Sequence, residues 1–143
     1  MSKKNLLILI AFIGITHLFS AQALDKSKYN QEKENALNFV INSPQFDSIY
    51  SAKRVYFSEN ELLLKSNTLT LKKNWRKVKV LDDSTLTRRG LDYINIGDFT
   101  MLGENPTKAR VQFYSSMTNK NLNVMLKKEN GKWIFENYLI MDN

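Results

Sequence analysis

Residues 108–116 read KARVQFYSS and residues 132–141 read KWIFENYLIM, and these two stretches decide the fold. In the first, apolar and polar residues alternate, as they do in a strand that buries one face. The second is an aromatic strand that follows Asn130-Gly131, a pair that readily adopts the positive φ angles of a tight hairpin turn. Two further strands are expected at residues 93–101 and 122–126. The last third of the chain therefore predicts a four-stranded antiparallel meander.

An amphipathic helix is expected before the sheet, over residues 27–42. Several strands carry apolar residues on both faces, which predicts a curved sheet. We expect the helix to pack on its concave face, and the segment before residue 92 or a second copy of the chain to cover part of the other. The predicted class is thus α+β, with an N-terminal amphipathic helix on a curved antiparallel sheet. The apolar stripe of the helix, at 3.6-residue spacing, consists of Tyr29, Ala36, Leu37, Val40 and Ile41.

The segment between the helix and the meander is the least regular part of the sequence. A short helix or turn is expected near residues 58–66, because Ser58 and Glu61 have the spacing of a helix-capping pair. Short strands are expected at residues 67–71 and 76–81. Asp82-Asp83-Ser84 predicts a turn between the second of these strands and the meander.

The first 23 residues have the order of a secretory signal peptide. Lys3 and Lys4 precede an uncharged apolar run at residues 6–19, and Ala21 and Ala23 supply the small residues of a cleavage site. The alternative is an uncleaved anchor, but the run is shorter than the roughly 20 apolar residues that span a bilayer. We therefore expect cleavage after Ala23, one domain at residues 24–143, no membrane span after cleavage, and a periplasmic or extracellular location.

Removal of the signal peptide also limits the catalytic and metal-binding residues that the mature chain can use. The chain has no cysteine, and its one histidine is His17, which leaves with the signal. This excludes disulfides, thiolate catalysis, catalytic triads and metal sites built from His or Cys. We expect no cofactor and no metal. The formal charge of +7, or +5 without Lys3 and Lys4, makes the mature surface basic and favours acidic partners.

The second half of the chain resembles the nuclear transport factor 2-like superfamily, one of the cystatin-like folds. The resemblance rests on the strand at residues 109–113, on the hairpin at residues 126–131, and on Gly131-Lys132-Trp133-Ile134, because members often end in a strand that begins with Gly-x-Trp. It implies a pocket between a helix and a curved sheet. It implies no particular activity, because this fold hosts enzymes, ligand binders and assembly modules.

Two carboxylates and three tyrosines are candidate pocket residues. Asp98 should share a face with Ile94 and Ile96, and a carboxylate in an apolar cavity can act as a general acid or base. Glu136 should share a face with Ile134 and Tyr138 in the same way. The alternative is that both lie at the solvent side or pair with Arg110 and lysines. The tyrosines could line a ligand pocket or be core residues with hydrated hydroxyls; they are Tyr93, Tyr114 and Tyr138.

A basic stretch at residues 62–81 contains no acidic residue, and Trp75 lies inside it. Cations beside an aromatic ring can bind phosphates. Export argues against nucleic acid, so anionic lipid head groups, an acidic polysaccharide or an acidic protein fit better. The alternative is a solvated lysine-rich face. The candidate anion-binding residues are Lys72, Lys73, Arg76, Lys77 and Lys79.

These observations favour a small exported binding or interaction module that is not an enzyme and has a shallow pocket. Its partner would be a small ligand or an acidic polymer or protein. One alternative is a carboxylate-dependent enzyme, of isomerase or hydrolase type, that uses Asp98 or Glu136. The other is an anion-binding surface protein that works through residues 72–79.

Overall fold

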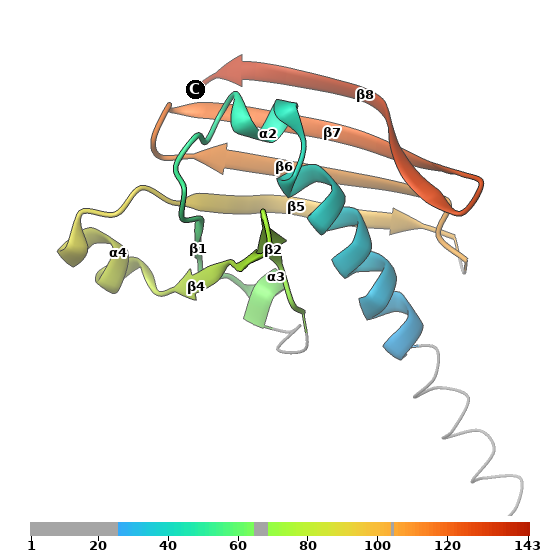
Figure 1. Cartoon of the computed structure of the whole chain (residues 1–143), viewed down its shortest axis with the longest axis horizontal. Helices are drawn as coiled ribbons and strands as arrows, with labels where there is room; N and C mark the ends of the chain where they lie inside the picture. The colour runs from blue at the N-terminus through green and yellow to red at the C-terminus, as the bar shows by residue number, and fades with distance from the viewer. Residues whose placement is uncertain (1–25, 65–68, 104) are drawn as a thin grey trace, which may run out of the picture.

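The computed structural model describes residues 26–64, 69–103 and 105–143, so the predicted signal peptide and part of the strand expected at residues 67–71 lie outside the described residues. Helices and a mostly antiparallel sheet confirm the α+β class (Figure 1). Residues 26–41 form a helix, here called helix 26–41. The other elements are α2 (Pro44–Asp47), β1 (Tyr56–Ser58), α3 (Glu61–Leu64), β2 (Lys72–Lys73), β3 (Arg76–Lys77), β4 (Lys79–Leu81), α4 (Asp83–Arg89), β5 (Ile94–Leu102), β6 (Lys108–Ser115), β7 (Lys120–Glu129) and β8 (Lys132–Asp142).

The main sheet has six strands in the order β4-β1-β5-β6-β7-β8. Strands β5 to β8 are antiparallel neighbours, as the alternating pattern predicts. The hairpin turn expected before β8 is also confirmed, because Glu129 pairs with Lys132 and both Asn130 and Gly131 have positive φ angles, of 50° and 75°. The short strand β1 is different, since it pairs in parallel with both β4 and β5.

The core lies between helix 26–41 and one face of the sheet. In Figure 1 this helix and α2 cross in front of the strands. Leu37 on the helix and Phe113 on β6 are fully buried and belong to the same apolar cluster. The ring of Phe113 also meets Phe46 of α2 and Phe57 of β1, with centroids 5.5 and 6.3 Å apart. Aromatic packing therefore joins the sheet to the segment that precedes it.

Two expectations for the middle of the chain are wrong. Residues 76–81 do not form one strand. Val78 is buried and belongs to no strand, and it separates β3 from β4 along the chain. Strand β3 belongs to a two-stranded sheet, and β4 joins the main sheet. Asp82-Asp83-Ser84 is not a simple turn but the start of α4. The Asp82 carboxylate accepts a hydrogen bond from Thr85 N at 2.8 Å, as a helix N-cap does. Hydrogen bonds from Ser84 and Thr85 lower the pKa of Asp82.

Tyr50 supports a prediction about alkaline pH. Its side chain is 1% exposed, its hydroxyl donates to the Asp92 carbonyl at 2.7 Å, and burial raises its pKa from 10.0 to about 12. The folded chain therefore keeps this proton after the unfolded chain has lost it. The contribution of Tyr50 to the free energy of unfolding should be complete below about pH 10 and should fall, by on the order of 1–3 kcal/mol, as the pH rises towards 12.

Urea unfolding of the wild-type chain and of Tyr50→Phe at a series of alkaline pH values measures this contribution. Lysines titrate in the same range in both chains, so the difference between the two free energies isolates the tyrosine. We expect that difference to shrink as pH rises, and a constant difference would contradict the assignment.

Candidate functional site

A ladder of side-chain hydrogen bonds holds the segment at residues 70–74 along helix 26–41. The ladder consists of the side chains of Glu34 and Asn38 on the helix and of Asn42 directly after its end. These residues are four positions apart and so lie along one edge of the helix. They bind the backbone of every second residue of the segment. The bonds are Thr70 N to Glu34 Oε2 (2.8 Å), Asn38 Nδ2 to the Thr70 carbonyl (3.1 Å), Lys72 N to Asn38 Oδ1 (2.7 Å), Asn42 Nδ2 to the Lys72 carbonyl (2.8 Å) and Asn74 N to Asn42 Oδ1 (2.9 Å).

The side-chain ladder can form because the spacing of its side chains along the helix matches the spacing of every second residue in the extended segment. Four residues of an α-helix rise about 6 Å, and two residues of an extended chain rise about 6.6 Å. Each asparagine amide can both donate and accept, so one side chain satisfies a carbonyl and the next outward amide. The helix side chains thus take the place of a neighbouring strand at the free edge of β2.

The next two residues form the tip of a hairpin. Strands β2 and β3 pair Lys73 with Arg76, so Asn74 and Trp75 are the whole turn. Both have positive φ angles, of 48° and 68°. Asparagine tolerates this conformation, but tryptophan rarely adopts it. The Trp75 side chain is nevertheless 96% exposed, so packing of the ring against the core does not explain its position. Residues 72–77 are called the basic hairpin below.

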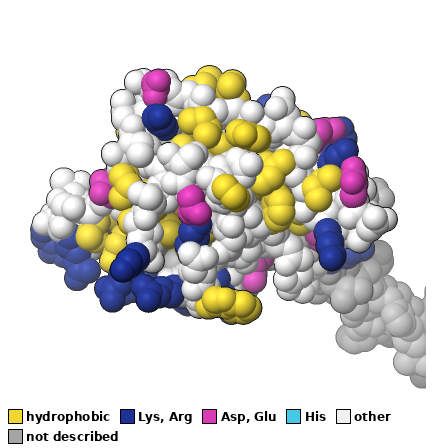
Figure 2. Space-filling model, turned by 45° about the horizontal axis from the view of Figure 1, so that its top comes forward, with side chains coloured by type: hydrophobic (Ala, Val, Ile, Leu, Met, Phe, Trp, Pro, Cys, Tyr) yellow, Lys and Arg dark blue, Asp and Glu magenta, His cyan; other side chains and the backbone are white. Residues whose placement is uncertain are grey.

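Beside the basic hairpin lies a pocket of about 200 Å³ with six cationic side chains in its lining. Figure 2 shows a band of Lys and Arg along the lower edge of the molecule, with hydrophobic atoms projecting next to it. The pocket is called the basic pocket. Its lining residues are Lys53, Arg54, Val55, Tyr56, Lys73, Arg76, Lys77 and Lys79.

Lys73 has a structural role within this lining. The residue is 5% exposed, and its Nζ donates to the Ile41 carbonyl at 2.7 Å and to the Asp47 carboxylate. It also lies over the Phe46 ring, 5.4 Å from the centroid. Its charge is therefore compensated, and it anchors the basic hairpin to α2 and to the end of helix 26–41.

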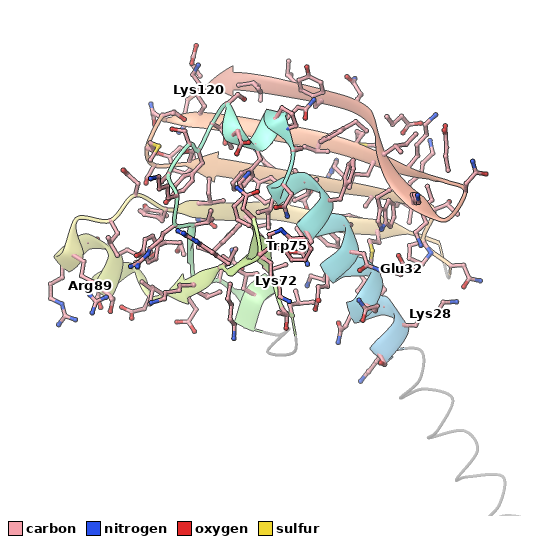
Figure 3. All side chains as sticks on the ribbon, in the orientation of Figure 1. Lys28, Glu32, Lys72, Trp75, Arg89 and Lys120 are labelled. Atoms are coloured by element: carbon pink, nitrogen blue, oxygen red, sulfur yellow. The ribbon has the colours of Figure 1, made fainter. Side chains whose placement is uncertain are left out.

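The other five cations of the basic pocket are exposed, and in the described part of the chain no carboxylate forms an ion pair with any of them. Three of them, Arg76, Lys77 and Lys79, were candidates from the sequence. Lys72 is also exposed but lies outside the lining. Figure 3 shows Lys72 and Trp75 together in front of the sheet, while Arg89 lies at the far end of α4.

Sequence reasoning missed Lys53 and Arg54. They lie about twenty positions before the basic hairpin, and the parallel pairing of β1 with β4 brings them beside it. The Tyr50 hydroxyl, which also approaches the Arg54 carbonyl at 3.3 Å, helps to hold this loop. The one signal in the sequence was that these two cations are adjacent.

Asp98 does not share a face with Ile94 and Ile96, so that expectation is wrong. The register of β5 against β6 shifts between Ile96 and Asp98, which marks a bulge at Gly97. Beyond the bulge Asp98 faces away from the core, where it binds Arg110 at 2.5 Å in a partly exposed ion pair.

A second bulge affects Glu136. The register of β7 against β8 shifts between Met125 and Leu126, and Glu136 is the extra residue. Its carboxylate binds Lys108 at 2.8 Å on the outer face. The shift also places Tyr138 opposite the buried Val124, so Ile134 and Tyr138 do not share a face as expected. Neither candidate carboxylate lies in an apolar cavity.

The structure does not bring the three candidate tyrosines together. Tyr114 lies on the outer face of β6 and its hydroxyl donates to Asn119 Oδ1 at 3.1 Å. Tyr138 lies on the core-facing side of β8 and packs on Phe135, with centroids 6.0 Å apart. Tyr93 lies before β5, where its backbone binds Ser116.

Among the described residues, His, Cys, Asp and Glu side chains form no group of three that could hold a metal ion. No helix among these residues is both long and apolar enough to cross a membrane.

Comparison with protein-family models, with curated proteins and with solved structures finds no match to this chain.

Proposed function

We propose that the protein is an exported binding module that holds an anionic group of its ligand in the basic pocket. The observation that carries this proposal is a set of five exposed cations around a concavity of about 200 Å³, none of which pairs with a carboxylate of the described residues. Like charges gathered around one small concavity repel one another, and a bound anion offsets that repulsion. Arginine and lysine donors together with the Tyr56 hydroxyl suit a phosphate or a carboxylate.

Two further points support a role in binding rather than catalysis. The carboxylates Asp98 and Glu136 are held in partly exposed ion pairs with Arg110 and Lys108, so neither faces an apolar cavity where it could act on a bound substrate. Buried apolar side chains of helix 26–41 and of the sheet belong to one cluster, which packs the helix against the sheet. We also propose that this helix-covered sheet is a nuclear transport factor 2-like arrangement, and that export of the chain places the basic pocket in the periplasm or outside the cell.

Inorganic pyrophosphate tests the pocket. We expect it to bind the full chain, to raise the temperature of unfolding, and to bind more weakly as salt increases. Replacement of Arg76, Lys77 and Lys79 by alanine should weaken this binding at least about tenfold, because hydrogen bonds to charged groups contribute on the order of 1.5–3 kcal/mol each. Calorimetric titration measures the affinity.

The matched control replaces three exposed cations outside the pocket, Arg88, Arg89 and Lys132, with alanine. It has the same net charge as the pocket variant and should keep the wild-type affinity. Equal loss in both variants would show that net charge, and not the basic pocket, attracts the anion. A wild-type chain that binds no pyrophosphate would contradict the proposed function.

A further inference from the structure

The tip of the basic hairpin combines three properties that its fold does not require. Trp75 is 96% exposed, its φ of 68° is one that tryptophan rarely adopts, and cations surround it in the sequence. The turn between β7 and β8 has the same two-residue form, and there the second position is Gly131, with a φ of 75°. Glycine is the residue that this geometry favours. A large ring held in this conformation and exposed to solvent indicates a function for the ring.

The hairpin is also held firmly at its base. The side-chain ladder fixes the backbone at Lys72 and Asn74 to helix 26–41. Buried Lys73 binds the Ile41 carbonyl and Asp47 immediately before the turn. The hairpin therefore holds the ring outward on a fixed backbone. Binding to a partner then costs little conformational entropy, because the hairpin is already ordered.

We propose that the basic hairpin docks on an anionic lipid bilayer. The Trp75 ring enters the interfacial region, and Lys72 and the five exposed cations of the basic pocket bind the phosphates of lipid head groups. This rests on the proposed function, because it names the source of the anionic group that the basic pocket holds. Tryptophan favours the boundary between head groups and hydrocarbon, and Lys and Arg near an anionic membrane surface add attraction for each charge.

The arrangement fits a bilayer better than a free anion or an acidic polymer. A bilayer has an anionic layer over an apolar layer, and the hairpin has cations beside an exposed apolar ring. A free phosphate would use the basic pocket and leave Trp75 without a role. An acidic polysaccharide or protein would meet the cations along its length and would not require a ring at the tip of a strained turn.

The two tryptophans of the chain allow a local measurement. Trp133 is 6% exposed and its Nε1 has no hydrogen-bond partner in the described structure, so Trp133→Phe removes no hydrogen bond. Lys128 Nζ lies 5.1 Å from the centroid of the Trp133 ring, and a phenylalanine ring still offers this cation an aromatic face. In this variant Trp75 is the one remaining tryptophan, and excitation at a wavelength that tyrosine does not absorb records its emission alone. We expect its fluorescence to shift to shorter wavelength with vesicles of phosphatidylglycerol mixed with phosphatidylcholine, and not with vesicles of phosphatidylcholine alone. Adding the Arg76, Lys77 and Lys79→Ala changes should abolish the shift.

Trp75→Gly separates the ring from the fold. By comparison with Gly131 the turn should be kept, so pyrophosphate affinity should stay at the wild-type value. Co-sedimentation should show the phosphatidylglycerol-dependent part of vesicle binding reduced about tenfold or more, because an aromatic ring removed from water contributes at least that factor. Both chains have the same N-terminus, so any association through residues 6–19 is common to them.

The outcomes distinguish this inference from the proposed function. If pyrophosphate binds but vesicles do not shift the Trp75 emission, the basic pocket remains an anion site and docking on a bilayer is overturned. A shift with soluble polygalacturonate but not with vesicles would also overturn it, in favour of an acidic polysaccharide. A wild-type chain that binds neither pyrophosphate nor vesicles would overturn both proposals.

Discussion

Phe113→Ala is expected to lower the free energy of unfolding by about 3–5 kcal/mol, the range typical of a fully buried phenylalanine. Phe113 is completely buried and lies where β6, α2 and β1 meet, edge-on to the rings of Phe46 and Phe57. Its removal leaves a cavity that three separate elements would have to move to fill. Urea denaturation, followed by circular dichroism, measures the loss.

Phe135→Ala is the matched control. This ring is partly buried on β8 near the edge of the sheet, where it packs on Phe39 with centroids 5.1 Å apart. Solvent can fill the space that it leaves, so the loss should be clearly smaller. If Phe113→Ala proves too unstable to purify, Phe113→Leu should still be less stable than Phe135→Leu. Equal losses at the two positions would place the centre of the core elsewhere.

Asn38→Ala is expected to lower the free energy of unfolding by about 1–3 kcal/mol, because it leaves two backbone groups without their partners. These are the Thr70 carbonyl and the Lys72 amide, which the Asn38 amide bridges at 3.1 and 2.7 Å. Alanine is the better helix former, which offsets a few tenths of a kcal/mol of this loss. Amide exchange gives a more specific signature, since protection should fall at Lys72 and at Asn74 while the meander is unchanged.

The control is Asn35→Ala on the same helix. Asn35 is exposed and accepts a hydrogen bond from Gln31 at 3.2 Å, and it is not part of the side-chain ladder. This change should be nearly neutral. A functional readout separates the two variants further, because Asn38→Ala should also weaken pyrophosphate binding by loosening the hairpin that carries Arg76 and Lys77. Unchanged protection at Lys72 and Asn74 in Asn38→Ala would show that the ladder does not hold the hairpin.

The sheet illustrates which parts of a fold local pattern can predict. Alternation along residues 108–116 and the Asn130-Gly131 turn predicted β6, β8 and their connections, because period-two patterning and positive φ angles are local properties. The two bulges were not predictable in this way. Each inserts one residue into one strand of a pair and so reverses the faces that follow, which is why Asp98 and Tyr138 lie on other faces than expected.

The middle of the chain shows the opposite case. Strands β1 to β4 have two or three residues each, too few for any periodicity to be read. Their pairing depends on a parallel contact with β5 and on side chains of a helix some thirty residues earlier. The basic hairpin therefore depends for its structure on tertiary contacts, although its charges were plain from the composition of residues 62–81.

The sequence by itself determined the α+β class, the antiparallel meander, the absence of cysteine and the run of cations, because these follow from local pattern and residue type alone. The tertiary structure decided which cations act together. It compensated Lys73 with Asp47, added Lys53 and Arg54 to the basic pocket, placed Asp98 and Glu136 in outer ion pairs, and exposed Trp75 at the tip of a fixed turn. The physical reason is that charge and hydrogen bonding act through distances in space, and in this chain strand pairing and the side-chain ladder set those distances.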